Sequence, residues 1–423
     1  MPIGASRKAN LRAACSVFAA GLAMRFLFIV GTKPYQIVDG TEEVAIAHSL
    51  AAHHGFSDPF RVPTGPTAHS SPAYPFILSL VYRAAPRDGH AAELIKEALA
   101  TLVASAQFAL LPLIAVGAGL PLAAGIVAGL LGALRPLHPY LEVKGEWTAA
   151  WCGLVLLLLT LILLRSWQAK LESWVAAIGR GLAFGVSLWF TPVFLPVIAG
   201  WLVVELWLSR RRIIRHAARA LLVSGGMMAI LQVPWAIRND RALGRPVWSR
   251  DNLGLELQLA FGDYSRPYYL DTRANLAANG AEFAHPNASA REAAELRQRG
   301  EIAYNAVKLD QARAWISAHP ARALELIGMR TVEFWFPLRI GFARFLLASA
   351  LTLLAWWGWW RLRRRSLLLF LALGVIWLGH PLVYYIIQSE PRYAYPIFWS
   401  KLLAVGSLWP LLKRQSASGT TPR

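Results

Sequence analysis

Ten stretches of mostly apolar residues, each near the length of a membrane-spanning helix, constrain this chain more than any other feature. A helix needs about 20 apolar residues to cross the hydrocarbon core of a bilayer. Charged residues make up only 16% of the 423 residues, against about 25% in soluble domains. The sequence therefore predicts an all-α polytopic membrane protein with about ten transmembrane helices. The segments are residues 11–31, 98–117, 119–135, 147–165, 174–191, 192–208, 219–235, 341–360, 366–387 and 396–412.

The apolar residues 72–86 decide the topology, because they are too few to span comfortably. As a helix they would extend about 22 Å, against a hydrocarbon core of about 30 Å, and Pro72 and Pro75 stand at their start. We expect an amphipathic helix lying on the membrane surface. With ten spans and the N-terminus inside, the basic clusters between spans are then cytoplasmic, as the positive-inside rule requires. Counting 72–86 as a span would place them outside. The clusters are Arg165 with Lys170, Arg210–Arg212 with Arg215 and Arg219, Arg361 with Arg363–Arg365, and Lys413 with Arg414.

This topology predicts three segments that face outward: the loop 32–97, the turn 135–146 and the region 236–340. Residues 1–235 form a membrane domain that includes the first outer loop. Residues 236–340 form a small extracytoplasmic subdomain, and 341–423 supply the last spans and a cytoplasmic tail.

Two helices are expected within the 236–340 region. Ser289-x-x-Glu292 predicts a capped helix start, with the helix continuing to about Ala318. His319-Pro320 would end that helix, and a second one would run toward Phe336, because a proline disfavours helical backbone in the residue before it.

Composition also excludes several classes of function. The net charge of +19 would favour nucleic-acid binding in a soluble protein, but here much of the excess lies in short runs between spans. We therefore expect no nucleic-acid partner. Cys15 and Cys152 lie in apolar stretches and offer no disulfide framework. No His/Cys/Asp set has metal-ligand spacing, and no phosphate-binding glycine loop stands between a strand and a helix. The sequence predicts neither a cofactor nor a metal.

The first outer loop carries candidates for acid–base chemistry. Asp39, Glu42 and Glu43 follow the first apolar segment. Carboxylates at the mouth of an apolar bundle are costly to leave unpaired, and they suit proton abstraction or cation binding. The structural alternative is a solvated loop aspartate, with two glutamates that favour the start of a helix by its dipole. His69 and Tyr74 lie farther along the loop, where they would contact a sugar or phosphate, or else form a turn into the surface helix.

A second polar segment, Glu390-Pro391-Arg392-Tyr393, precedes the last span. Arg392 can bind a phosphate through two parallel hydrogen bonds, and Tyr393 can donate another. The alternative is an interfacial arginine paired with Glu390. Both polar segments fall at outer ends of spans, so we expect them to meet at one membrane face around a lipid-linked substrate.

Three further charged residues stand within or beside the predicted spans. Lys144 and Glu146 lie at the outer end of the fourth span and are candidate substrate-binding residues, although charges at that depth usually pair internally. Arg25 lies within the first apolar segment, and we expect its side chain to snorkel toward the membrane surface.

Taken in order, these motifs resemble one known family, the bacterial polyprenyl-phosphate-sugar-dependent glycosyltransferases of the family 39 type. That family is related to protein O-mannosyltransferases and to the lipid A aminoarabinose transferase, and it has the GT-C membrane fold. The similarity extends over most of the chain. It is carried by Asp39 with Ala45–Leu50, Gly65–Ala68 and Pro72–Pro75; by Gly145-Glu146; by Val233–Asn239 with Gly244–Pro246 and Asp251–Gly254; and by Glu390–Pro396.

The resemblance implies a mechanism and a location. Asp39 matches the acidic residue that acts as general base on an acceptor hydroxyl, and the donor is a sugar on a polyprenyl phosphate, transferred with inversion. Positive charge would stabilise the phosphate leaving group, with Arg392 the first choice and Lys144 and His69 weaker ones. Some relatives carry a second acidic residue directly after the first; here Gly40 follows Asp39, and acid resumes only at Glu42. The implied location is a bacterial inner membrane, with the site facing the periplasm.

Two other functions fit the composition. A lipid-linked sugar transporter or flippase would line a path through the membrane midplane with polar residues, whereas the polar residues here gather at one face. A non-catalytic cell-envelope assembly protein would need no base at position 39. The acceptor is open: protein, lipid and glycan all fit, because a fold does not select among them.

Overall fold

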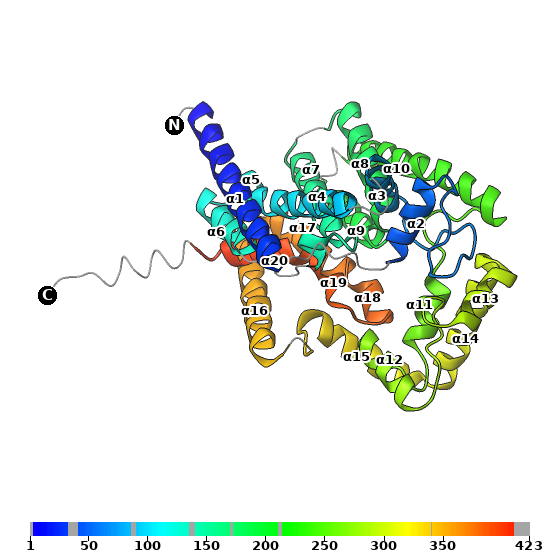
Figure 1. The fold of residues 1–423 in the computed structure, drawn as a ribbon. Helices are drawn as coiled ribbons and strands as arrows, with labels where there is room; N and C mark the ends of the chain where they lie inside the picture. The colour runs from blue at the N-terminus through cyan, green and yellow to red at the C-terminus, as the bar shows by residue number, and fades with distance from the viewer. Residues whose placement is uncertain are drawn as a thin grey trace.

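The computed structural model describes residues 3–32, 41–85, 90–134, 140–169, 172–209, 214–339 and 341–409. Helix accounts for 78% of the structure, and the described residues include no strand beyond two isolated bridges. Figure 1 shows a bundle of long helices with a separate group of shorter helices on one side. The prediction of an all-helical chain is confirmed.

Every predicted span coincides with helix in the structure. Six helical segments are long and apolar enough to cross a membrane, and three shorter helices are also apolar. The chain is therefore a multi-pass membrane protein. The elements are α1 (Ile3–Thr32), α4 (His90–Ala109) continued by α5 (Leu111–Gly117), α6 (Leu122–Ala133), α7 (Ala149–Gln168), α8 (Trp174–Phe190), α9 (Phe194–Leu208), α10 (Ile214–Leu243), α16 (Phe342–Arg365), α17 (Leu367–Gly379) with α18 (Leu382–Ile386), and the turn η2 (Tyr395–Ile397) leading into α20 (Phe398–Gly406).

Small residues set the closest helix contacts in the bundle. A Cβ at Gly358 of α16 would lie 2.1 Å from the carbonyl oxygen of Ala404, and one at Gly406 of α20 would lie 2.3 Å from that of Ala124. Both distances are far below van der Waals contact. Glycine is therefore required where α16 and α6 meet α20, as expected where membrane helices pack backbone to backbone.

The first outer loop forms two short helices. In α2 (Glu42–Ala51), the Thr41 hydroxyl accepts a hydrogen bond from the Val44 amide and caps the start of the helix. Helix α3 (Ala73–Ala84) packs against α2 through one buried face, while Phe76 and Leu80 on its other face are 47% and 64% exposed. The structure thus forms the amphipathic helix expected in residues 72–86.

Five helices between α10 and α16 form the group seen beside the bundle in Figure 1. The predicted cap is present, since the Ser289 hydroxyl accepts from the Glu292 amide at 3.0 Å. The predicted single helix to Ala318 is wrong, however, because Gly300 has a φ of 77° and divides it in two. The break at His319-Pro320 is confirmed. The helices are α11 (Leu253–Ala260), α12 (Tyr269–Ala278), α13 (Ala290–Arg299), α14 (Glu301–Ala318) and α15 (Pro320–Trp335).

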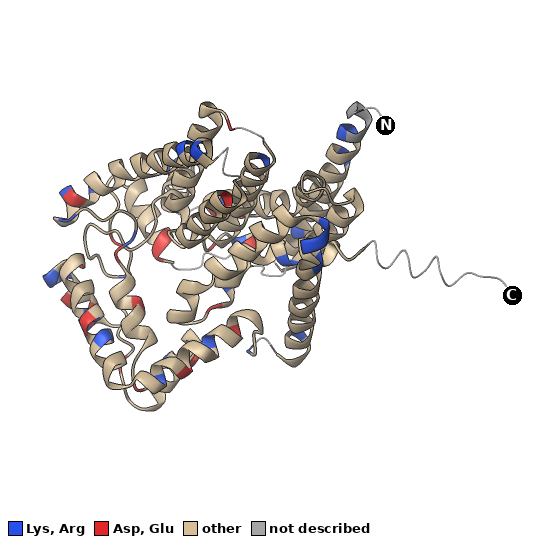
Figure 2. Ribbon diagram, turned by 180° about the vertical axis from the view of Figure 1, so that it is seen from behind, with Lys and Arg blue, Asp and Glu red and all other residues tan. Residues whose placement is uncertain are grey.

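Figure 2 shows many of the charged residues on the α11–α15 group and near the ends of helices. Arg25 lies within α1 and is buried. Arg25 is 0% exposed; it donates to Glu142 at 2.6 Å and to the carbonyl oxygens of Gly21, Gly132 and Ala133. The expectation that Arg25 snorkels is wrong. Glu142 lies in the short π-helix η1 (Tyr140–Lys144), which returns a carboxylate to the middle of the bundle and removes the need to reach water.

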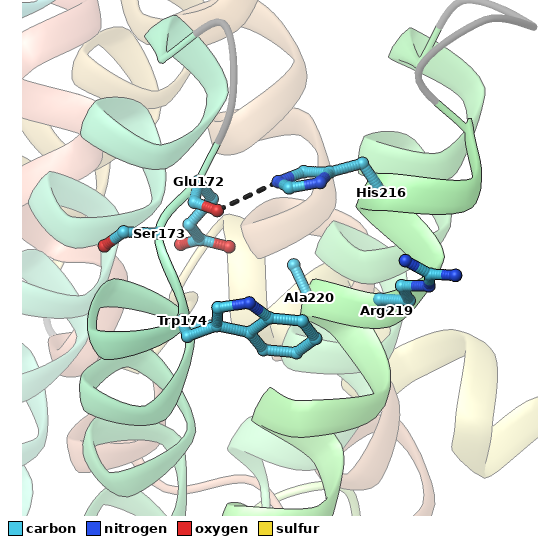
Figure 3. Close-up of a pocket in the computed structure, with 7 residues that line it drawn as sticks. Glu172, Ser173, Trp174, His216, Arg219 and Ala220 are labelled. Carbon is cyan, nitrogen blue, oxygen red and sulfur yellow. Dashed lines mark hydrogen bonds between the residues drawn. The ribbon is translucent and has the colours of Figure 1, made fainter.

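A second buried arginine is paired with carboxylates. Arg180 of α8 lies 2.9 Å from a carboxylate oxygen of Glu172 and 2.8 Å from one of Glu205. Figure 3 shows the small cavity beside this network, where His216 donates to the Glu172 carbonyl oxygen at 3.0 Å. Its volume is about 10 Å³, which is room for about one water molecule.

Candidate active site

A cavity of about 580 Å³ lies where several helices end beside the α11–α15 group. Its wall combines the start of α2, the starts of α7 and α9, the end of α8, and the segment that links α18 to α20. Phe190, Val193 and Val383 give it an apolar part. Its charged lining residues are Glu42, Glu43, Arg250, Glu256, Glu390 and Arg392.

Arg392 lies in this wall on α19 (Pro391–Ala394). Its guanidinium carbon is 3.4 Å from the centre of the Trp147 ring, a cation–π contact that fixes the side chain. One nitrogen lies 3.4 Å from the Tyr393 hydroxyl, whereas Nε and Nη1 have no hydrogen-bond partner. Within the described part of the chain, no carboxylate oxygen lies within 4.0 Å of the guanidinium, so Arg392 does not pair with Glu390. Most of its donors remain available to an anion.

Tyr393 lies in the same wall and is held from two sides. Its ring stacks on Tyr384 with 4.3 Å between the ring centres. Its carbonyl oxygen accepts from Nε2 of His380 at 3.0 Å. These contacts anchor the turn that carries Arg392, and the Tyr393 hydroxyl lies beside the guanidinium.

The acidic residues of the first loop divide by environment. Asp39 lies outside the described residues. Glu42 lines the cavity, where one carboxylate oxygen accepts from the Asn287 side chain at 3.0 Å. Glu43 is turned toward α7, where it accepts from the Thr148 hydroxyl at 2.5 Å and from the Thr148 amide at 3.2 Å. Burial raises the pKa of Glu43 in spite of these bonds. Glu43 therefore acts as a cap for α7, and Glu42 presents its carboxylate to the cavity.

His69 also lines the cavity. Burial lowers the pKa of its imidazole well below the usual value, so the ring is neutral at physiological pH. It packs edge-on against Phe60, with 5.0 Å between the ring centres. The carbonyl oxygen of His69 accepts from Nε of Arg250 at 2.9 Å. A neutral imidazole suits a hydrogen bond to a hydroxyl better than charge stabilisation of a phosphate.

The segment before His69 is fastened to two distant helices. Arg238 of α10 donates to the Thr67 carbonyl oxygen at 2.6 Å. Glu301 of α14 accepts from the Thr67 hydroxyl and, at 2.6 Å, from the Ala68 amide. These contacts position the loop relative to both the bundle and the α11–α15 group.

Three predicted substrate-binding residues are not among those that line the cavity: Tyr74, Lys144 and Glu146. Tyr74 is 1% exposed and donates to the Gly145 carbonyl oxygen. A carboxylate oxygen of Glu146 lies 3.9 Å from Lys96, and the Glu146 carbonyl oxygen accepts from Thr41. These residues join the first loop to α4 and η1. These three residues do not line the cavity, and their role in substrate binding stays a prediction.

Sequence reasoning missed four residues of the wall that carry a charged or imidazole side chain. The motif containing Asp251 drew attention to that region, yet Arg250 is the residue that lines the cavity. Nothing in its local sequence distinguishes it from other arginines of the 236–340 region. Glu256, His285 and His380 also line the wall, and only the fold brings them there.

The comparisons bear on the fold. No protein-family model and no curated protein sequence matches the chain. Solved structures of the oligosaccharyltransferase of the archaeon Archaeoglobus fulgidus are similar to it. The one with an inhibitory peptide and a dolichol-phosphate has a TM-score of 0.57 at 13% identity, covering 99% of this chain and 52% of that one. The complex with zinc and sulfate has a TM-score of 0.56, also at 13% identity, covering 96% and 50%.

This chain has the GT-C fold. It spans about half the length of the solved structures that it matches. At 13% identity the likeness shows the fold and no more, so the GT-C prediction is confirmed and the resemblance to the bacterial family 39 type stays a prediction. The described residues contain no group of three His, Cys, Asp or Glu residues arranged to hold a metal ion. Because Asp39 lies outside them, metal independence also stays a prediction.

Proposed function

We propose that this chain is an integral membrane glycosyltransferase that moves a sugar from a polyprenyl-phosphate donor to an acceptor hydroxyl, with inversion of the anomeric centre. The observation that carries the proposal is the cavity wall. There the Arg392 guanidinium, which has no carboxylate partner among the described residues, and the Glu42 carboxylate line the same cavity as apolar residues. Phosphate, acceptor hydroxyl and lipid tail would each meet suitable chemistry.

Arg392 would bind the phosphate and stabilise the charge that develops on it as the glycosidic bond breaks. A guanidinium that is already fixed in place stabilises such charge without reorganisation during the reaction. Arg250, in the segment between α10 and α11, would also stabilise the charge on the phosphate. Its Nε is already bonded to the His69 carbonyl oxygen. The lipid tail would lie along the apolar residues, including Val193 and Val383, at the helix ends.

Asp39 would act as the general base that takes the proton of the acceptor hydroxyl, as the family resemblance implies. Glu42, three residues along the chain, would bind the same hydroxyl and orient it toward the anomeric carbon. His69, neutral at physiological pH, would hydrogen-bond a hydroxyl of the sugar or acceptor. The bond to phosphate breaks, the bond from the acceptor oxygen forms, and the proton passes to Asp39.

The positions of the helix ends support a proposal for the side of the membrane. Helices α7 and α9 begin at the cavity, and they end at or just before basic residues such as Arg165 and Arg210–Arg212. Helix α17 begins directly after Arg363–Arg365 and leads toward the cavity. Under the positive-inside rule, the cavity faces away from the cytoplasm. We infer an active site on the periplasmic face of a bacterial inner membrane.

The acceptor remains a choice among protein, lipid and glycan. One similar structure is tethered to an acceptor peptide that contains the NVT sequon, which supports testing peptides first. A flippase is the weaker reading, because the charged residues that line the cavity gather where helices begin and end, whereas a transporter would line a path through the membrane midplane with polar residues.

The test is transfer by the purified protein in liposomes that contain radiolabelled polyprenyl-phosphate sugars, with a panel of peptide, lipid and glycan acceptors. Wild type should release polyprenyl phosphate and label one acceptor class. Asp39→Ala should abolish transfer while expression in the membrane persists. Translocation of the donor without transfer would favour the flippase, and full activity in Asp39→Ala would refute the assignment of the base.

A further inference from the structure

The loop between α12 and α13 enters the cavity beside Glu42. His285 lines the wall and is 8% exposed. Its ring lies parallel to Phe283, with 6.0 Å between centres, and edge-on to Phe60 at 5.7 Å. An aromatic enclosure of this kind holds the imidazole in one orientation.

The main chain assigns the tautomer of His285. The amide of Asn287 donates to Nδ1 at 3.1 Å, so Nδ1 accepts and the hydrogen of the neutral ring lies on Nε2. Nε2 lies 3.9 Å from a carboxylate oxygen of Glu42. This is longer than a hydrogen bond, but catalytic contacts in empty sites often shorten when substrate binds. The imidazole therefore directs an N–H toward the carboxylate.

Asn287 reaches the same carboxylate oxygen from the same loop. Its side-chain nitrogen donates to Glu42 at 3.0 Å, and its side-chain oxygen accepts from the Arg61 amide at 3.1 Å. The Ser289 cap at the start of α13 follows directly. One loop thus brings a hydrogen-bonded amide nitrogen and a nearby imidazole nitrogen to one oxygen of Glu42, and the loop itself is held by the Arg61 amide and the Ser289 cap.

We propose that His285 and Asn287 are positioning residues that direct Glu42 toward the acceptor hydroxyl. This inference rests on the proposed function. Asn287 is bonded to Oε1 of Glu42 and the His285 ring nitrogen lies near the same atom, which leaves Oε2 to accept from the acceptor O–H. The α11–α15 group thereby contributes to the acceptor half of the site, while Arg392, from another segment, serves the donor phosphate.

The expected consequence is a division of kinetic effects between the two substrates. If His285 or Asn287 is removed, Glu42 no longer orients the acceptor hydroxyl correctly. The contacts of the sugar donor stay in place. His285→Ala should lower kcat/KM for the acceptor about tenfold, with little change in KM for the donor. Asn287→Ala should behave in the same way. His285→Gln places an amide nitrogen near the position of Nε2 and should restore most of the loss.

The experiment compares these variants with wild type in the liposome assay and uses binding of polyprenyl phosphate alone as a separate readout. That binding should be unchanged in His285→Ala. In a Glu42→Gln background, His285→Ala should cost no more than about twofold, because positions that act on one contact are not additive. His319→Ala, at an exposed histidine of the same helix group, is the matched control and should have wild-type kinetics.

The outcomes separate the two proposals. Wild type that neither binds polyprenyl phosphate nor transfers sugar sinks the proposed function. Wild type that transfers, together with unchanged acceptor kinetics in His285→Ala and Asn287→Ala, overturns only the positioning role. Equal loss for donor and acceptor, or no recovery in His285→Gln, would also overturn it, because it would mark a general structural defect.

Discussion

Arg25 and Arg392 are both arginines with buried nitrogen atoms in a mainly apolar protein, and their surroundings differ. Arg25 has a carboxylate at 2.6 Å and three carbonyl oxygens around it. Arg392 rests on Trp147 and leaves two nitrogens without partners, beside a cavity of about 580 Å³. A buried charge that lacks a partner is costly. The comparison teaches that Arg25 is built to hold helices together and Arg392 to receive a ligand.

The largest effect is expected where the open arginine is removed. Arg392→Ala should reduce kcat/KM for the donor about 10²–10³-fold, the usual cost of losing one fixed donor to a developing charge. Arg392→Lys should recover only part of this activity, because an ammonium group lacks the planar fork. The measurements are transfer kinetics and the thermal midpoint in detergent, which should stay near the wild-type value. If Arg392→Ala were active but unstable, Arg392 would hold helices together, as Arg25 does, and would not receive a ligand.

The paired arginine should show the opposite pattern. Arg25→Leu leaves Glu142 buried without its partner and should destabilise the protein by about 3–5 kcal/mol, whereas Arg25→Leu combined with Glu142→Leu should recover much of the loss. Activity per folded molecule should be unchanged in both. Thermal unfolding in detergent, followed by size-exclusion chromatography, measures the first effect. If Arg25→Leu were stable and inactive, Arg25 would belong to the site.

Arg250 is intermediate between the open Arg392 and the paired Arg25. It lines the cavity, yet its Nε is bonded to the His69 carbonyl oxygen. Arg250→Ala should lower activity by about tenfold through a looser His69 loop and a weaker field at the phosphate. This loss should be smaller than that of Arg392→Ala. Donor kinetics of the two variants, measured side by side, decide the order.

The smallest expected effect is a dependence of stability on pH that arises in the clamp between the first loop and α14. Burial raises the pKa of Glu301 from 4.5 to about 7. Because the folded state binds the proton more tightly, this contribution to stability is fully present below about pH 4.5 and is lost as pH rises to about 7. In Glu301→Gln, the thermal midpoint should change less with pH between about 4.5 and 7 than it does in wild type. An unchanged slope would show that another group is responsible.

Sequence patterns found the helices well, for a physical reason. Length and hydropathy are local properties, and the bilayer itself requires continuous apolar helices. In the outer group, helices α11 and α12 were not predicted. The helix break at Gly300 was also missed, because it depends on a single glycine with positive φ.

The candidate site was predicted less completely. Glu42, His69, Arg392 and Tyr393 line the cavity, whereas Tyr74, Lys144 and Glu146 do not. Polar residues near a membrane surface look alike in sequence whether they meet a ligand or a neighbouring helix. The contacts that separate them are long-range: Tyr74 bonds to Gly145, and Glu146 lies near Lys96.

By itself the sequence determined that this chain is a helical membrane protein with its basic clusters between spans, because transfer into lipid depends on composition along each segment. Only the tertiary structure decided which charges are paired. It brought Glu142 to Arg25 across 117 positions of the chain and left Arg392 open. Coulomb attraction and hydrogen bonding act over a few ångströms, and nothing in the order of residues states which groups come that close.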